Sequence, residues 1–167
     1  MQQYTPPSQR DVGADLFTTA GWISGSFMVP AMRSISDFAN QQHDFFKLKN
    51  VKLPGLPNVV PFFILQRRSV VLVIPHAAEQ SVKSTITAEK DMKDVSCAFH
   101  GGVVSGTLTV AKGLRVSDVV LQRDPFFYLT NCTMYLRTGA TPEIRKDIEM
   151  VVINRWEIVG VSEPRFV

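Results

Sequence analysis

The chain has 167 residues, of which 45% are hydrophobic and 20% charged, a balance typical of a globular protein. The 18 basic and 15 acidic residues leave a net charge of +3 that is spread over both halves, so charge alone does not indicate a nucleic-acid partner. Cys97 and Cys132 are the two cysteines, which excludes a disulfide framework and favours a reduced, cytoplasmic setting.

The N-terminal stretch, residues 1–13, has neither the basic nor the apolar region of a secretory signal, and we expect it to be a flexible tail. No run in the chain reaches the roughly 18 apolar residues that a membrane-spanning helix needs. We therefore expect no transmembrane segment, and proximity to a membrane only through a partner.

The chain repeats itself when it is displaced by 81 residues. Residues 22–53 then lie over residues 103–134 without a gap, with 10 identical pairs in 32 positions. Beyond residue 53 the displacement drifts to 88, and residues 64–73 lie over residues 152–161. Because chance rarely gives so long a gapless match, the sequence predicts an internal duplication. The identical pairs are Ser24/Ser105, Gly25/Gly106, Val29/Val110, Ser36/Ser117, Asp37/Asp118, Gln41/Gln122, Phe45/Phe126, Phe46/Phe127, Leu48/Leu129 and Asn50/Asn131.

Each copy predicts the same elements in the same order. Alternating apolar and polar residues, rich in β-branched and aromatic types, indicate five strands. Gly25 and Gly106 lie within the second strand, where glycine marks a bulge or a sharp bend. A helix of one or two turns should follow that strand, with Ser36 and Ser117 as N-caps. The strands are expected at residues 15–19, 22–29, 45–53, 61–65 and 69–74, and at residues 96–100, 103–110, 126–136, 149–153 and 157–161.

Five short strands and one short helix in about 70 residues, written twice, are typical of small, strongly bent antiparallel barrels. The sequence therefore predicts a mainly β protein made of two tandem five-stranded β-barrels of SH3-like or Sm-like type. The expected organisation is an N-terminal tail (1–13), a first barrel (14–76), a linker (77–94), a second barrel (95–163) and a C-terminal tail (164–167).

Several segments resemble a family of uncharacterised bacterial proteins: "ISGSFMVPAMRSISDFAN", "VSGTLTVAKGLRVSDVVLQ", "FFKLKN", "FFYLTN" and "VVINRWEIVGVSE". The resemblance covers most of residues 15–163. The second copy fits the closing Asn-Arg pair better, through Asn154 and Arg155, where the first copy has Gln66 and Arg67. The resemblance implies a small Sm-like or SH3-like barrel in a bacterial cytoplasm, and it brings neither a reaction nor a functional residue.

Residue types that catalyse or bind metal do not form a recognised pattern. Cys97 and His100, with Cys132 and His76, would supply four ligand types suited to zinc. The cysteines fall in predicted strands, however, and apolar residues replace them in the first copy, so we interpret them as core residues. We expect no metal, no cofactor and no enzymatic activity, with a small hydrolytic enzyme as the least favoured alternative.

The most basic local pattern lies in the first copy, in the third strand and the last hairpin, beside several phenylalanines. Aromatic faces next to cations are what single-stranded nucleic acid needs, although Tyr128 and Thr130 replace two of the lysines in the second copy. A large aromatic side chain near the matching hairpin of the second copy is typical of an interface anchor. The candidate binding residues are Lys47, Lys49, Lys52, Arg67, Arg68, Arg155 and Trp156.

We therefore predict a non-catalytic protein-interaction module, a scaffold or accessory subunit of a larger bacterial assembly. A protein partner or larger complex is the expected ligand. The alternative is the binding of RNA or single-stranded nucleic acid through the basic and aromatic face of the first barrel.

Overall fold

The computed structural model describes residues 8–41, 44–77, 89–121, 124–137 and 140–163. Residues 1–7 and 164–167 of the expected tails, and residues 78–88 of the expected linker, lie outside the described residues. The described residues form ten strands, two short α-helices and two 3-10 turns. The first half has β1 (Gln9–Thr18), β2 (Gly21–Pro30), α1 (Ile35–Ala39), β3 (Phe45–Lys52), β4 (Val60–Gln66), η1 (Arg67–Ser69) and β5 (Val70–Pro75). The second half has β6 (Lys90–Phe99), β7 (Gly102–Ala111), α2 (Val116–Val120), β8 (Phe126–Leu136), β9 (Glu143–Asn154), η2 (Arg155–Glu157) and β10 (Ile158–Ser162).

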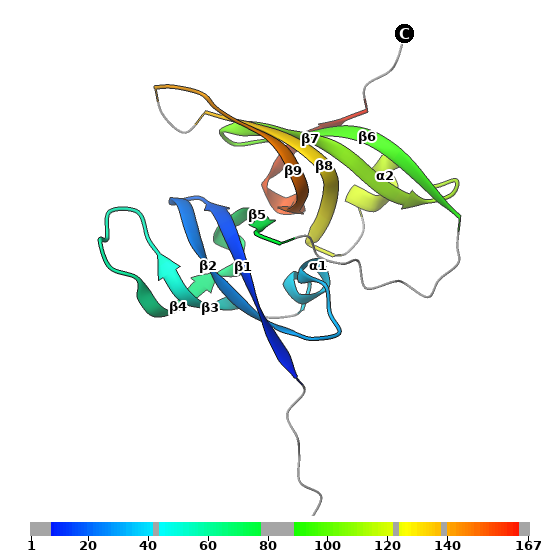
Figure 1. Ribbon diagram of the computed structural model, residues 1–167. Coiled ribbons are helices and arrows are strands. Elements are labelled where there is room, and N and C mark those ends of the chain that lie inside the picture. The colour runs from blue at the N-terminus through cyan, green and yellow to red at the C-terminus, as the bar shows by residue number, and fades with distance from the viewer. Residues whose placement is uncertain (1–7, 42–43, 78–88, 122–123, 138–139, 164–167) are drawn as a thin grey trace, which may run out of the picture.

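All ten strands belong to one antiparallel sheet, in the order β10-β6-β7-β8-β9-β5-β1-β2-β3-β4. The mainly β class is confirmed, but the expectation of two five-stranded barrels is wrong. A barrel would require β5 to return to β4 of its own half. Instead β5 pairs with β1 on one side and with β9 on the other, which joins the halves into one open sheet (Figure 1).

The first strand of each half begins earlier than expected. β1 starts at Gln9, within the stretch expected as a tail, and β6 starts at Lys90, within the expected linker. Both strands form long hairpins with the strand that follows, from Gln9 opposite Pro30 and from Lys90 opposite Ala111. Backbone pairing extends these strands into segments where the alternation of apolar residues is too weak to indicate a strand.

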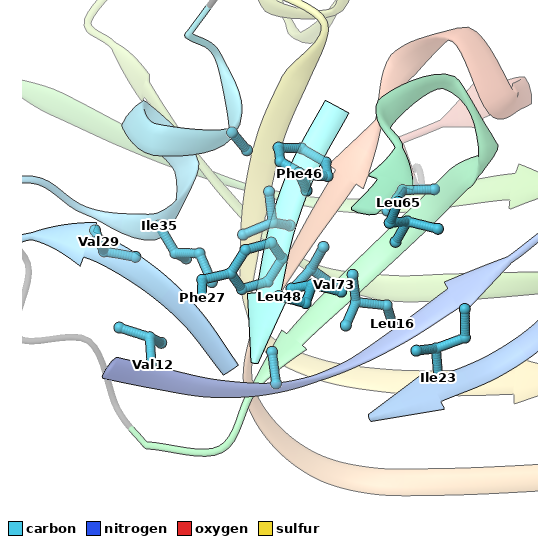
Figure 2. Close-up of a cluster of buried hydrophobic side chains, with 14 of the residues drawn as sticks. Val12, Leu16, Ile23, Phe27, Val29, Ile35, Phe46, Leu48, Leu65 and Val73 are labelled. Carbon is cyan, nitrogen blue, oxygen red and sulfur yellow. The ribbon is translucent and has the colours of Figure 1, made fainter. Parts of the chain in front are cut away.

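The two halves have the same order of elements, and each builds its own apolar core. Figure 2 shows the first core, where Leu16, Phe27, Phe46 and Leu48 point toward one another from β1, β2 and β3. Phe27 and Phe46 meet edge to face, with their ring centroids 5.5 Å apart. This edge-to-face geometry is the one that aromatic pairs prefer.

Matching backbone irregularities bend the two halves. The register of β2 against β3 shifts beside Gly25, and that of β7 against β8 shifts beside Gly106, as the mid-strand glycines predicted. Asn50 and Asn131 lie opposite these shifts with φ values of 51° and 52°. Asparagine tolerates this left-handed backbone better than most residues, which explains why both copies have it there.

The helix N-caps differ from the prediction. Ser34 rather than Ser36 caps α1: its Oγ accepts the Asp37 N–H at 3.1 Å and donates to Asp37 Oδ2 at 2.7 Å. Ser36 lies inside the helix and is buried. In the second half the N-cap is Arg115, whose N–H donates to Asp118 Oδ2 at 2.8 Å. In the first half the prediction failed because two serines lie close together and only Ser34 has an acidic residue three positions later. In the second half Arg115 stands at the position that corresponds to Ser34.

Candidate interaction surface

Strand β4 ends the sheet, and apolar side chains cover the outer face beside it. Phe45 on β3 is 53% exposed, and Phe62 and Ile64 on β4 are 50% and 55% exposed. These residues alternate with Phe46, Leu48 and Leu65, which point into the core. The strand period therefore places large apolar groups on both faces, and one of those faces is in contact with solvent. We call Phe45, Phe62 and Ile64 the β4 face.

The predicted lysines lie beside the β4 face. Lys47 is directly opposite Ile64, and Lys49 is directly opposite Phe62, so these side chains share one side of the sheet. Lys49 Nζ lies 3.7 Å from Asp11 Oδ1, an exposed ion pair of small energetic weight. Lys52 is exposed at the end of β3, beyond the bend at Asn50.

The predicted hairpin residues lie elsewhere, where β5 of the first half pairs with β9 of the second half. We call this contact between the two halves the joint. A cleft of about 460 Å³ is lined by Arg67 and Arg68 from η1 and by Trp156 from η2. Arg67 lies over the Phe126 ring, with Cζ 5.3 Å from the centroid, and Arg155 stacks on Trp156 at 4.3 Å. The structure therefore brings four of the seven candidates together, while the three lysines line a different surface.

Two charged groups near the joint have perturbed pKa values. Burial lowers the pKa of Arg67, while the charges of Asp44 and Asp124 oppose this change. Burial disfavours ionised Asp15, but hydrogen bonds from Ser24 and His76, with the charges of His76 and Arg145, hold its pKa below the ordinary value.

Arg145 connects Asp15 of the first half to the second half. Its Nη1 lies 3.8 Å from Asp15 Oδ2, and its guanidinium lies over the Trp22 ring with Cζ 4.0 Å from the centroid. A cation over an aromatic face is attracted by the ring quadrupole. This contact therefore supports the joint on one side of the sheet.

The cysteines lie in the core of the second half. Burial raises the pKa of Cys97 to about 11 and that of Cys132 to about 12, so both remain thiols at neutral pH. His76, one of the four residues weighed as zinc ligands, forms a hydrogen bond between its Nε2 and Asp15 Oδ1 at 3.0 Å. Within the described ranges, no three His, Cys, Asp or Glu side chains are grouped as metal ligands would be.

The joint itself depends on residues that sequence reasoning missed. The pairs Leu72 with Ile153 and Val73 with Val152 join β5 to β9. Phe126, Met150 and Val152 of the second half pack in the core of the first half. Nothing in the local pattern distinguishes these side chains from the residues of an ordinary strand, because the contact links segments that are far apart in the sequence.

Two asparagines cap the backbone at the joint. Asn40, at the end of α1, donates from Nδ2 to Phe126 O and accepts the Phe126 N–H at Oδ1, both at 2.8 Å. Asn154 is buried and donates from Nδ2 to Val70 O at 2.8 Å. The second copy has Leu121 where the first has Asn40, so the sequence difference between the copies was the one available signal for this contact.

A second hollow lies at the other end of the sheet, between α2 and β10. It has a volume of about 740 Å³ and is lined by apolar residues of both elements, with Arg115, Arg155 and Glu163 also at its wall. We call this hollow the α2–β10 groove. Val159 on β10 and Leu121 after α2 are 80% and 79% exposed there.

Comparisons of the chain with protein-family models, with curated proteins and with solved structures found no match. In the part of the chain that the structure describes, no helix is long and apolar enough to cross a membrane.

The variant Asn40→Ala tests the joint. It removes both hydrogen bonds to Phe126 and leaves that residue's N–H and C=O unpaired, so we expect a loss of about 1–3 kcal/mol in the free energy of unfolding. Urea unfolding followed by circular dichroism measures this difference. The matched control is Asn58→Ala, in an exposed loop. Equal stabilities of the two variants would contradict the role assigned to Asn40.

Proposed function

We propose that the protein is a non-catalytic interaction module, a scaffold or accessory subunit of a larger assembly in a bacterial cytoplasm. The observation that carries the proposal is the β4 face, where Phe45, Phe62 and Ile64 are each at least half exposed on the last strand pair of the sheet. Large apolar side chains grouped in this way mark an interaction site on a soluble protein.

The position of these residues suggests how a partner is bound. Only β3 pairs with β4 among the described strands, so the outer edge of β4 presents backbone donors and acceptors. An extended segment of a partner can add to such an edge through main-chain hydrogen bonds, while its side chains contact the neighbouring apolar groups. Edge pairing combined with the β4 face gives both affinity and register.

The proposal includes the origin of the chain by duplication and its kinship with a bacterial family of small β units. The 10 identical pairs, the repeated element order and the shared left-handed Asn50 and Asn131 support the duplication. A duplicated unit that keeps its core but changes its surface offers two different ends to its partners.

The double variant Phe62→Glu/Ile64→Glu tests the proposal. Wild-type protein used as bait in a bacterial lysate should capture a defined set of proteins, and the variant should lose them because two carboxylates on the β4 face resist desolvation. The control variant Met92→Glu/Ile144→Glu carries the same charges at exposed apolar positions of β6 and β9 and should keep them. Capture by the β4-face variant equal to wild type, or no capture by any of the three, contradicts the proposal.

Binding of single-stranded nucleic acid is the second candidate. The exposed rings of Phe45 and Phe62 lie on the same side of the sheet as Lys47 and Lys49, which supplies stacking faces beside phosphate-binding cations. The cleft with Arg67, Arg68 and Trp156 would add further cations and one more aromatic ring.

Fluorescence anisotropy with mixed-sequence RNA and DNA oligonucleotides tests this candidate. If it holds, affinity should fall steeply with salt, and replacing Lys47, Lys49 and Lys52 by alanine should weaken binding by roughly tenfold or more through lost phosphate contacts. Replacing Lys90, Lys93 and Lys146 removes the same charge from the second half and should have little effect. Equal losses in the two triple variants, or no binding by wild type, would argue against this function.

A further inference from the structure

The two free ends of the sheet are the counterparts of the two strands that meet at its centre. In the centre, β5 of the first half pairs with β9 of the second. By position in the repeat, β10 corresponds to β5 and β4 corresponds to β9, and these two strands end the sheet on opposite sides. The chain therefore contains one joint of this kind, and the two end strands of its sheet, β4 and β10, are the strand types that would form another.

The β4 face matches the side of the joint that inserts. Phe126, Met150 and Val152 enter the core of the first half, where Phe126 is 2% exposed and Val152 is fully buried. Their counterparts in the first half, at displacements of 81 and 88 residues, are Phe45, Phe62 and Ile64. At the joint two of these positions are buried and the third, Met150, is partly buried, whereas all three are exposed at the end of the sheet.

The α2–β10 groove matches the side of the joint that receives. In the first half, Phe126 and Val152 pack in one cluster with apolar residues of α1 and β5. The counterparts of those α1 and β5 residues line the groove. The first-half residues are Ile35, Ala39, Val70 and Val73, and the corresponding groove residues are Val116, Val120, Ile158 and Val161.

Exposure and residue type at the groove support the same correspondence. Val71 is 5% exposed at the joint, whereas its counterpart Val159 is 80% exposed. Leu121 occupies the position of Asn40, which bonds the Phe126 backbone. An exposed leucine there would face the counterpart of Phe126, the exposed Phe45, and would replace two hydrogen bonds by an apolar contact.

We propose that the β4 face of one chain inserts into the α2–β10 groove of a second copy and repeats the internal joint between chains. The proposal rests on the proposed function and names the partner of the same face. In the register of the internal joint, Leu65 lies opposite Gly160 and Ile64 lies opposite Val161 of the neighbouring chain. Such a head-to-tail contact is heterologous, so it leads to a closed ring or to a filament.

A symmetric contact fits the observations less well. Pairing of β4 with β4 of a second copy would cover the β4 face of both chains and would leave the α2–β10 groove of both, including Val159, in water. The head-to-tail contact covers both apolar surfaces at once. The internal joint also shows that these two surface types fit each other, which no symmetric contact in the molecule does.

Two variants with opposite defects test the proposal in purified protein. Phe62→Glu/Ile64→Glu disables the inserting side, and Leu121→Glu/Val159→Glu disables the receiving side. Light scattering coupled to size exclusion should show wild type and the Met92→Glu control as oligomers, and each double variant alone as a monomer of 18.7 kDa. An equimolar mixture of the two double variants should form a dimer of twice that mass, because one intact inserting side meets one intact receiving side.

The proposal is overturned by wild type that stays monomeric up to about 1 mM, or by variants that remain monomers when mixed. Circular dichroism of each variant confirms that it folds. Should a variant unfold, the mass of wild type still shows whether the protein self-associates. Monomeric wild type that still captures lysate proteins through the β4 face would refute self-association and leave the interaction function intact. Oligomers with an unchanged mass in both double variants would refute the assigned surfaces.

Discussion

When β5 pairs with β9, the last strand of the first half becomes a neighbour of the fourth strand of the second, and two small units become one sheet. The backbone pairing is short, and side chains strengthen it: Phe126 and Val152 enter the first core, while Phe17, Val71 and Leu72 enter the second. A five-stranded unit of this size buries a limited core, so sharing side chains across the joint increases the apolar area that each half removes from water.

The joint also determines what the ends of the sheet must look like. On the proposed duplication, each half has two complementary sides, and one chain can pair only one side of each half internally. The remaining sides are solvent-exposed in a single chain, where Phe62, Ile64 and Val159 are apolar and exposed, as the proposal requires. Long apolar edges are a hazard that proteins usually blunt with charge or cover with another element. Lys47 and Lys49 beside the β4 face supply part of that charge, and a second copy would supply the cover.

Much of the fold follows from local sequence, and the joint does not. The repeat places the strands, the bends at Gly25 and Gly106, and the short helices, because each depends on residues close together in the chain. Local sequence does not identify the partner of β5, since the continuous apolar run in Val70–Pro75 suits pairing with β4 as well as with β9. For the same reason the sequence grouped Arg67 and Arg68 with the lysines of β3, whereas in the structure these two arginines lie at the joint. The inserting residues escaped notice because Phe45 and Phe126 are identical in sequence and differ only in what covers them.

The central claim is that the joint between the halves is repeated between chains, and its register gives the most direct test. In the double variant Ile64→Cys/Val161→Cys the two thiols would face each other across neighbouring chains, at a separation that a disulfide can bridge. Mild oxidation followed by non-reducing electrophoresis should give a ladder of chain multiples. The single variants, and the mismatched pair Ile144→Cys/Val161→Cys, should give none. The absence of a ladder in the matched pair, or an equal ladder in the mismatched pair, would contradict the account.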